Sequence, residues 1–215
     1  MTYYVPIILD LRDRCCVLVG GGAVAERRVA SLLPSGARIK VISPRLTPWL
    51  IQTWEQGQIN WTRRCYQKGD LQGAWIVYAV TDQPEVNDEV AAEARELGVM
   101  VNQASEGRLS SFITPSSFRR GELIVAVSTS GAAPGAAKQI CDEIATRFGD
   151  EYEEYIHFLS QARSVIKDQV QDASRRRRLF KKLLEIDILR AIQAGKFSPP
   201  DGEEMICWID QYQEG

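Results

Sequence analysis

Three small residues near the start of the chain have the spacing of a nucleotide-binding turn. Gly20, Gly22 and Ala25 follow the apolar run Val17–Val19, which is the G-x-G-x-x-A pattern of a strand, a tight turn and a helix N-terminus. Gly20 permits the turn, Gly22 has no Cβ to obstruct a pyrophosphate, and Ala25 lets the helix lie close to the strand. The N–H groups and positive dipole end of that helix would face the phosphates. The pattern predicts a dinucleotide site, although glycines also serve ordinary turns.

The stretch after the next predicted strand bears on which dinucleotide is bound. Arg38–Ile42 alternates like a strand and is followed by Ser43, at the place where many dinucleotide sites carry a carboxylate for the ribose hydroxyls. Ser43 could accept those hydroxyls as a neutral group. Arg45 could meet a 2′-phosphate, or it could be a solvated loop arginine. We expect NAD rather than NADP.

The elements that must position these residues alternate between strands and helices. Apolar runs predict strands at Tyr4–Leu9, Cys16–Val19, Arg38–Ile42, Ile59–Arg63, Trp75–Val80 and Val99–Asn102. Helical patterns lie between them, at Ala23–Leu33, Thr47–Gly57 and Pro84–Leu97. Pro6 favours an edge position for the first strand. The series predicts an α/β fold with a Rossmann-type doubly wound parallel sheet. Its ligand edge would carry Gly20, Ser43, Thr81 and Asn102.

The second half of the chain has a different pattern. Ser111–Pro115 and Glu122–Val127 are predicted to be extended and joined by the polar turn Ser116–Gly121, and Pro134–Phe148 is predicted to be a helix. Apolar spacing then predicts helices over 150–215, with a final short helix at Met205–Tyr212. We therefore expect a nucleotide-binding domain at 1–110, a small α+β dimerisation segment at 111–149 and a helical domain at 150–215.

Composition excludes several classes of function. The net charge of −2 gives no general reason to expect nucleic acid or membrane binding. No run of about 18 apolar residues is present, and the N-terminus lacks the pattern of a signal peptide, so we expect a cytoplasmic protein. The five cysteines form no C-x-x-C pair and His157 is the only histidine, so we expect neither a structural zinc site nor a metal site of several imidazoles.

Several ordered segments together carry a likeness to a known family. They are Pro6–Leu9, Val19–Arg27, Ala79–Asp82, Val101–Asn102, Ser111–Pro115, Val125–Pro134 and Arg175–Phe180. On these residues the whole chain resembles the NAD-dependent precorrin-2 dehydrogenase module of siroheme synthases. The resemblance implies a homodimer that oxidises precorrin-2 to sirohydrochlorin by hydride transfer to NAD⁺. In some members of the family the same site inserts Fe²⁺ to give sirohaem.

The resemblance also implies a set of cofactor contacts. By position these are Ala23 and Val24 at the helix start, and Pro44 and Arg45 after the second strand. The same groove would be lined by Gly20, Gly22, Thr81, Asp82 and Asn102.

One stretch departs from the family's pattern. The family has Asn-Val-Val-Asp after the fifth strand, and its aspartate is the leading catalytic candidate. Here the sequence reads Asn102-Gln103-Ala104-Ser105-Glu106, so Ser105 takes the aspartate's place and Glu106 is the adjacent carboxylate. Our candidates for proton handling are Glu106, Ser105 and Asp82, in that order, although Asp82 could instead cap the following helix. Loss of the aspartate affects metal insertion most.

Precorrin-2 carries many carboxylates, which suggests two binding features. The helix start after Ser128, Thr129 and Ser130 could hold a carboxylate, or these residues could be a simple helix cap. Arg175 and Arg176 belong to a run of four arginines that could bind carboxylates in a bidentate way. A solvated or dimer-paired helix face is the alternative that we favour for at least two of the four.

Two other functions are kept beside the dehydrogenase. One is a bifunctional enzyme that also inserts Fe²⁺. The other is a carrier or regulatory protein that binds tetrapyrrole or NAD without turnover, because the family's aspartate is missing. A short-chain reductase is disfavoured, since Tyr78, Tyr152 and Tyr155 all lack a lysine four residues on.

Overall fold

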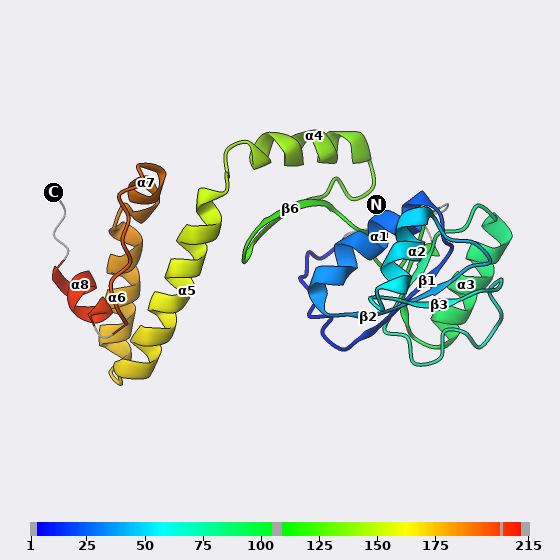
Figure 1. The fold of residues 1–215 in the computed structure, drawn as a ribbon, viewed down its shortest axis with the longest axis horizontal. Coiled ribbons are helices and arrows are strands. Elements are labelled where there is room, and N and C mark those ends of the chain that lie inside the picture. Colours follow the sequence, from blue (N-terminus) through cyan, green and yellow to red (C-terminus); the bar gives the residue numbers. More distant parts are fainter. Residues whose placement is uncertain (1–3, 105–108, 203, 212–215) are drawn as a thin grey trace. The chain divides into compact units, whose positions relative to one another are not determined.

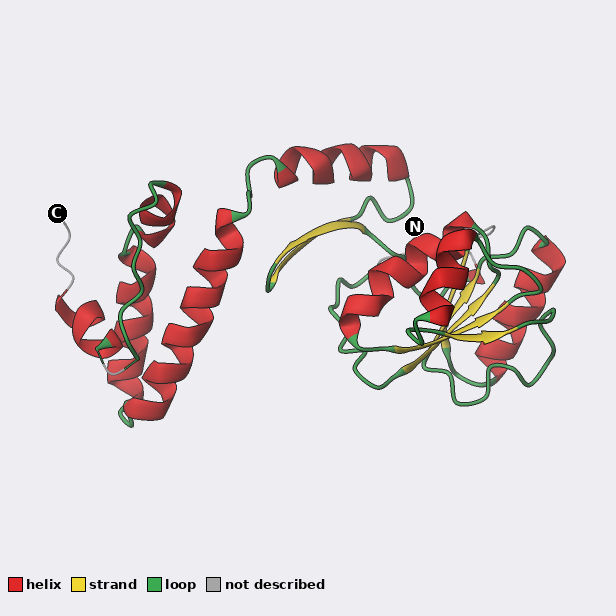
Figure 2. Cartoon of the chain, viewed as in Figure 1, coloured by secondary structure: helices red, strands yellow, loops and turns green. Residues whose placement is uncertain are grey.

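The computed structural model describes residues 4–104, 109–202 and 204–211. The chain forms two compact units (Figures 1 and 2). The first consists of residues 1–114 with 130–132, and the second of residues 115–129 with 133–215. The division expected from the sequence into 1–110, 111–149 and 150–215 stays a prediction.

A parallel sheet forms the centre of the first unit. Its strands are β1 (Cys15–Val19), β2 (Arg38–Ile42), β3 (Asn60–Thr62), β4 (Ile76–Ala79) and β5 (Met100–Gln103). Within the described residues their order is β3-β2-β1-β4-β5, and every neighbouring pair is parallel. Val19 pairs with Ile42 on one side and with Ala79 on the other, so the carboxyl ends of three central strands meet at one edge. The predicted doubly wound parallel sheet is confirmed.

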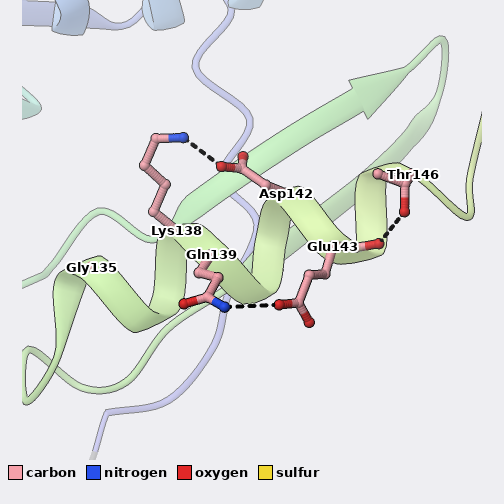
Figure 3. Close-up of a pocket in the computed structure, with 6 residues that line it drawn as sticks. All are labelled: Gly135, Lys138, Gln139, Asp142, Glu143 and Thr146. Carbon is pink, nitrogen blue, oxygen red and sulfur yellow. Dashed lines mark hydrogen bonds and ion pairs between the residues drawn. The ribbon is translucent and has the colours of Figure 1, made fainter.

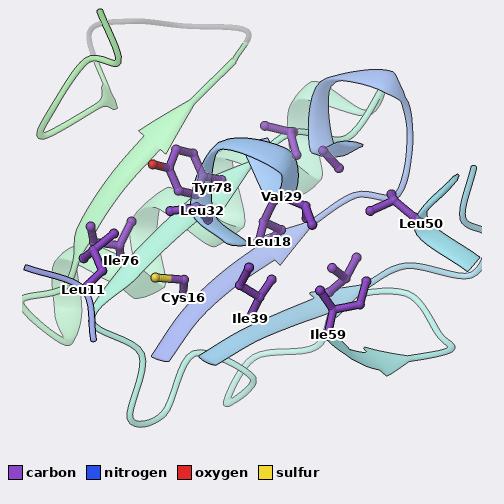
Figure 4. Close-up of a cluster of buried hydrophobic side chains, with 13 residues drawn as sticks. Leu11, Cys16, Leu18, Val29, Leu32, Ile39, Leu50, Ile59, Ile76 and Tyr78 are labelled. Atoms are coloured by element: carbon purple, nitrogen blue, oxygen red, sulfur yellow. The ribbon is translucent and has the colours of Figure 1, made fainter. Parts of the chain in front are cut away.

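Helices cover both faces of this sheet (Figures 1 and 2). Its helices are α1 (Ala23–Leu32), the short 3₁₀ helix η1 (Leu33–Ser35), α2 (Pro48–Glu55) and α3 (Pro84–Glu96). Side chains alternate along β1, so Cys16 and Leu18 pack toward α1 and α2, whereas Val17 and Val19 pack toward α3. Figure 4 shows the first of these two clusters, with Leu18 against Val29 of α1. Both faces of the sheet are thus buried, as a parallel sheet requires.

The second unit combines a hairpin with helices. Its elements are β6 (Ser116–Arg120), β7 (Leu123–Val127), α4 (Pro134–Ala145), α5 (Glu151–Gln169), α6 (Ala173–Glu185), α7 (Ile188–Gln193) and α8 (Met205–Gln211). The two strands are antiparallel, with Phe118 opposite Val125. Helices α5 to α8 share a core that includes Phe158, Leu179 and Ile209. The predicted helical C-terminal region is confirmed.

Two predictions about extended segments are wrong. Tyr4–Leu9 forms no strand: Val5, Ile7 and Ile8 are 80%, 66% and 78% exposed, and Leu9 at its end packs against the core of the sheet. Ser111–Pro115 forms no strand either: the Ser111 N–H donates to the Val101 carbonyl, but the Val101 N–H donates to the Ser111 hydroxyl instead of a backbone carbonyl.

The turn expected at Ser116–Gly121 is also wrong, since Ser116–Arg120 is the strand β6. Its polar composition is compatible with a strand because it pairs with the apolar β7. The chain reverses at Gly121, whose φ of 54° is a conformation that glycine adopts readily.

Substitution of two leucines in α6 would test where the core of the helical region lies. Leu179 is 1% exposed and Leu184 is 66% exposed. We expect Leu179→Ala to lower the free energy of unfolding by about 2–5 kcal/mol, because it leaves a cavity. The matched Leu184→Ala change should stay within about 0.5 kcal/mol of the wild type. Urea unfolding followed by circular dichroism measures both, and equal losses in the two variants would contradict the assigned core.

Candidate functional site

The turn after β1 is built around a close approach of two backbones. Gly20 has a φ of 124°, and its N–H donates to the Ile42 carbonyl at 3.0 Å. A Cβ at Gly20 would lie 2.5 Å from the carbonyl oxygen of Val80, at the end of β4. Both the conformation and the space therefore require glycine here. This turn carries the chain from β1 across the edge of the sheet to α1.

Gly21 makes a second close approach, which the G-x-G-x-x-A pattern did not single out. A Cβ at Gly21 would lie 2.1 Å from the carbonyl oxygen of Arg45. The Gly21 carbonyl also accepts the Thr47 N–H at 3.0 Å. The glycine turn is therefore packed against the β2–α2 turn. The sequence signal for this contact was a third glycine in an uninterrupted run.

Gly22 differs from its neighbours because the space beside it is open. An added Cβ would meet no atom of the described residues within 4 Å. Gly22 is the N-cap of α1 and makes no side-chain cap bond, so its end of the helix is left to a ligand or solvent. Ala25 is fully buried, which lets α1 lie close to the sheet. An open helix N-terminus beside a glycine turn is suited to phosphate.

The β2–α2 turn holds three of the predicted cofactor residues. Ser43 is buried, and its hydroxyl donates to the Arg45 carbonyl at 2.7 Å. Pro44 and Arg45 are exposed. Thr47 closes the turn: its hydroxyl donates to Glu26 of α1 at 2.5 Å and accepts the Leu50 N–H at the start of α2. The Ser43 hydroxyl already donates its hydrogen within the turn. Toward a ribose hydroxyl it could therefore act as an acceptor, through the lone pairs of its oxygen.

The end of β4 is fixed by a buried asparagine. Asn87 is fully buried in α3 and its side-chain oxygen accepts the Thr81 N–H at 3.0 Å and the Thr81 hydroxyl at 2.8 Å. Sequence reasoning singled out Thr81 but not Asn87. Asp82 follows as an exposed residue, and the N-cap of α3 is Gln83. Asp82 therefore does not cap this helix, and it lies in the turn after β4, at the carboxyl edge of the sheet.

The end of β5 is fixed by amide side chains. Asn102 is buried and donates to the Phe112 carbonyl at 3.0 Å. Gln103 is buried and donates to Asp88 of α3 at 2.7 Å. Ser105 and Glu106, the first two catalytic candidates, lie outside the described residues.

A buried tyrosine lies on the opposite side of β4 from α3. Tyr78 packs edge-on against Phe112 and lies under the guanidinium of Arg28, which is 5.6 Å from the ring centre. Burial raises the pKa of the Tyr78 hydroxyl and lowers the pKa of Arg28. Tyr78 is therefore neutral at physiological pH, and its ring packs between Phe112 and Arg28.

The predicted substrate residues have partners within the chain. The Thr129 hydroxyl accepts the N–H of Ala133 at 3.1 Å, but Ala133 is itself the N-cap of α4 and this bond does not cap the helix. Ser128 and Ser130 lie in the same connection to α4, and Ser130 has a positive φ of 54°. Arg175 pairs with Asp210 at 3.1 Å, and Arg176 donates to the Val170 carbonyl at 3.1 Å. Their binding of substrate carboxylates stays a prediction.

A hollow on α4 contributes no further site. Figure 3 shows its lining, in which Lys138 is paired with Asp142, Gln139 with Glu143, and Thr146 with the Glu143 carbonyl. Every lining residue comes from α4 or its C-cap, and none belongs to the predicted site. In the described part of the chain no three His, Cys, Asp or Glu side chains gather in a way that could hold a metal ion. Nor does any described helix have the length and apolar character needed to cross a bilayer.

These features define a class of protein. A glycine turn and an open helix N-terminus at the point where the strand order reverses, between β1 and β4, form a dinucleotide-binding site of the Rossmann type. Residues 7–116 match the family model described as "Putative NAD(P)-binding", and residues 152–188 match the model of the SirC C-terminal domain. The chain belongs to this NAD(P)-binding family.

Known proteins are similar to the chain over most of its length. The siroheme synthase of Nitrosococcus oceani is 35% identical over 199 residues, which are 93% of this chain and 42% of that protein. The siroheme synthase of Methylobacillus flagellatus is 34% identical over 191 residues, 89% of this chain and 41% of that protein. The chain thus spans less than half the length of these relatives. A solved structure of SirC, a precorrin-2 dehydrogenase, is 27% identical with a TM-score of 0.77, and the likeness covers 97% of this chain and all of that one.

Substitutions at two adjacent glycines should distinguish an effect on NAD⁺ binding from an effect on folding. Ala at position 22 fits the backbone and meets no protein atom, but its methyl group occupies the space that a pyrophosphate needs. We expect Gly22→Ala to melt within about 2 °C of the wild type and to bind NAD⁺ at least about tenfold more weakly. Gly21→Ala should instead lower the melting temperature, because its Cβ meets the Arg45 carbonyl. Calorimetric titration and thermal melts measure both effects, and normal NAD⁺ binding by Gly22→Ala would exclude this phosphate site.

Proposed function

We propose that this chain catalyses the NAD-dependent dehydrogenation of precorrin-2 to sirohydrochlorin, a step in siroheme biosynthesis. The observation that carries the proposal is the open N-terminus of α1 behind Gly20 and Gly22, within a chain that is similar over 97% of its length to a precorrin-2 dehydrogenase. The siroheme synthase relatives and the match of residues 152–188 to the SirC C-terminal domain support the same activity.

The residues of the first unit would hold the cofactor at the carboxyl edge of the sheet. The N–H groups of Ala23, Val24 and Ala25 would bind the pyrophosphate at the start of α1. Ser43, Pro44 and Arg45 would meet the adenosine half. Thr81 and Asn102, each fixed by a hydrogen bond to the loop or helix beside it, would form the floor of the groove at the ends of β4 and β5.

Oxidation of precorrin-2 removes one hydride and one proton from the substrate. When bound at this edge, NAD⁺ would supply the hydride acceptor. The chain must orient the macrocycle, exclude water from the transfer and take the proton. Glu106, Ser105 and Asp82 are the candidates for that proton. Asp82 is the one among them that the structure describes, and its exposed position at the end of β4 is compatible with reaching a substrate.

A homodimer and a carboxylate-binding surface complete the proposal. Among the described residues β6 and β7 form a sheet of two strands, so each has an outer edge that could pair with a strand of a second copy. Exposed Arg177 and Arg178 stand beside Arg175 and Arg176 on α6 and add positive charge for the acetate and propionate groups of the substrate. If iron is inserted as well, Fe²⁺ would be a second substrate.

The reaction itself tests the proposal. Under anaerobic conditions, precorrin-2 with NAD⁺ should give NADH and sirohydrochlorin in equal amounts, followed by absorbance. We expect Glu106→Ala to lower kcat by about 10²-fold or more if Glu106 takes the proton. Asp82→Asn is the matched carboxylate control and should change kcat less than the Glu106 variant.

Other outcomes would identify the alternatives. If the wild type turns over and Glu106→Ala has the same kcat, the rate would come from positioning of the substrate and from the cofactor. Binding of NAD⁺ and tetrapyrrole with no turnover in the wild type would contradict the dehydrogenase and leave a carrier or regulatory protein.

A further inference from the structure

Trp61 on the edge strand β3 makes a contact with the cofactor turn that the proposed mechanism does not use. Trp61 pairs in register with Val41 of β2. Its indole Nε1 donates to the backbone carbonyl of Ser43 at 2.8 Å, two residues beyond that partner. Ser43 is the last residue before the exposed Pro44 and Arg45. The indole therefore ties the edge of the sheet to the start of the turn that would receive adenosine.

The indole is itself held in place. Its ring lies 5.3 Å from the ring of Trp54 in an edge-to-face arrangement, with 79° between the planes. The guanidinium of Arg63 lies 5.4 Å from the Trp61 ring centre. Trp61 is half-buried, so the orientation of its N–H is set by packing rather than by the hydrogen bond alone. Because the indole is already ordered, little conformational entropy is lost when its N–H binds the turn.

The rest of the turn is secured from inside the domain. The Ser43 hydroxyl donates to the Arg45 carbonyl, and that same carbonyl packs against the backbone of Gly21. The Thr47 N–H donates to the Gly21 carbonyl. The turn is thus tied to the glycine loop at its far end and to Trp61 at its near end. Between these two attachments lie the side chains expected to contact the cofactor.

We infer that Trp61 is a positioning residue of the cofactor site, whose indole N–H fixes the β2–α2 turn in the shape that receives the adenosine half of the dinucleotide. The inference rests on the proposed function. Without this donor the turn samples more conformations, and the cofactor must order it on binding. We expect no effect at the reactive end of the cofactor or on the tetrapyrrole, because in Rossmann-type sites the end of β2 faces the adenosine half.

The test compares two tryptophans in the full chain. Trp61→Phe keeps an aromatic ring but removes the N–H donor. We expect it to raise the Kd for NAD⁺, measured by calorimetric titration, about five- to tenfold, the value of one net hydrogen bond. Trp54→Phe is the matched control, since Trp54 packs on Trp61 but has no hydrogen bond to the turn among the described residues. It should change the Kd less than about twofold.

Steady-state kinetics distinguish a positioning role of Trp61 from a merely structural one. In Trp61→Phe the KM for NAD⁺ should rise by the same factor as the Kd, whereas kcat and the KM for precorrin-2 stay at wild-type values. General destabilisation would instead lower the melting temperature and the active fraction, which reduces kcat without changing KM. NAD⁺ affinity equal to that of the wild type, or equal losses in Trp61→Phe and Trp54→Phe, would overturn the inference.

A second variant covers the case in which Trp61→Phe does not fold. Replacement of Trp61 by 3-benzothienylalanine keeps the bicyclic ring and puts sulfur in the place of the N–H, so it removes the donor with little change in packing. It should raise the Kd for NAD⁺ about five- to tenfold with little change in melting temperature, and unchanged affinity would overturn the role of the N–H. If wild-type protein does not bind NAD⁺, the proposed function fails. If it binds NAD⁺ and the variants match it, only the role of Trp61 fails.

Discussion

The close approach of backbone at Gly20 and Gly21 is the constraint on which the nucleotide-binding unit depends. Gly20 lies against the Val80 carbonyl and Gly21 against the Arg45 carbonyl, at distances that leave no room for a side chain. These two contacts bring the turns after β1, β2 and β4 together. Helix α1 begins at Ala23, directly after these contacts, and the space beside its N-cap Gly22 is open. A methyl group at either contact would separate elements that the site needs side by side.

Side-chain hydrogen bonds hold this arrangement in place. The ends of β2, β4 and β5 are each fixed by a partner outside the strand, namely Trp61, Asn87 and Asp88. Each such hydrogen bond contributes about 0.5–1.5 kcal/mol net, but an unpaired buried partner would cost more. The exposed residues Arg45 and Asp82 therefore extend from backbone that is already ordered, which lowers the entropic cost of binding.

In the second unit, some charged side chains make contacts within the fold and others remain exposed. Arg175 pairs with Asp210 of α8 while both are about half exposed, so this pair alone adds little to stability. Arg176 donates to the Val170 carbonyl at the C-terminus of α5, where a cation is favoured by the helix dipole. The buried core of Phe158, Leu179 and Ile209 holds the helices together. The run of four arginines therefore divides between internal contacts and exposed positive charge.

The sequence by itself determined the order of strands and helices in the first unit, because apolar periodicity and the stop signals of glycine and proline act locally. It also determined the glycine turn and the open helix start, since the spacing of small residues reflects how closely backbones approach. Tertiary structure decided what depends on register: that Gly21 meets Arg45, that Asn87 holds Thr81 and that Trp61 reaches Ser43. It also decided that Ser116–Arg120 pairs as a strand and that Tyr4–Leu9 does not. Those outcomes could not be predicted because a polar segment becomes a strand, and an apolar one fails to, only through the partner that lies beside it.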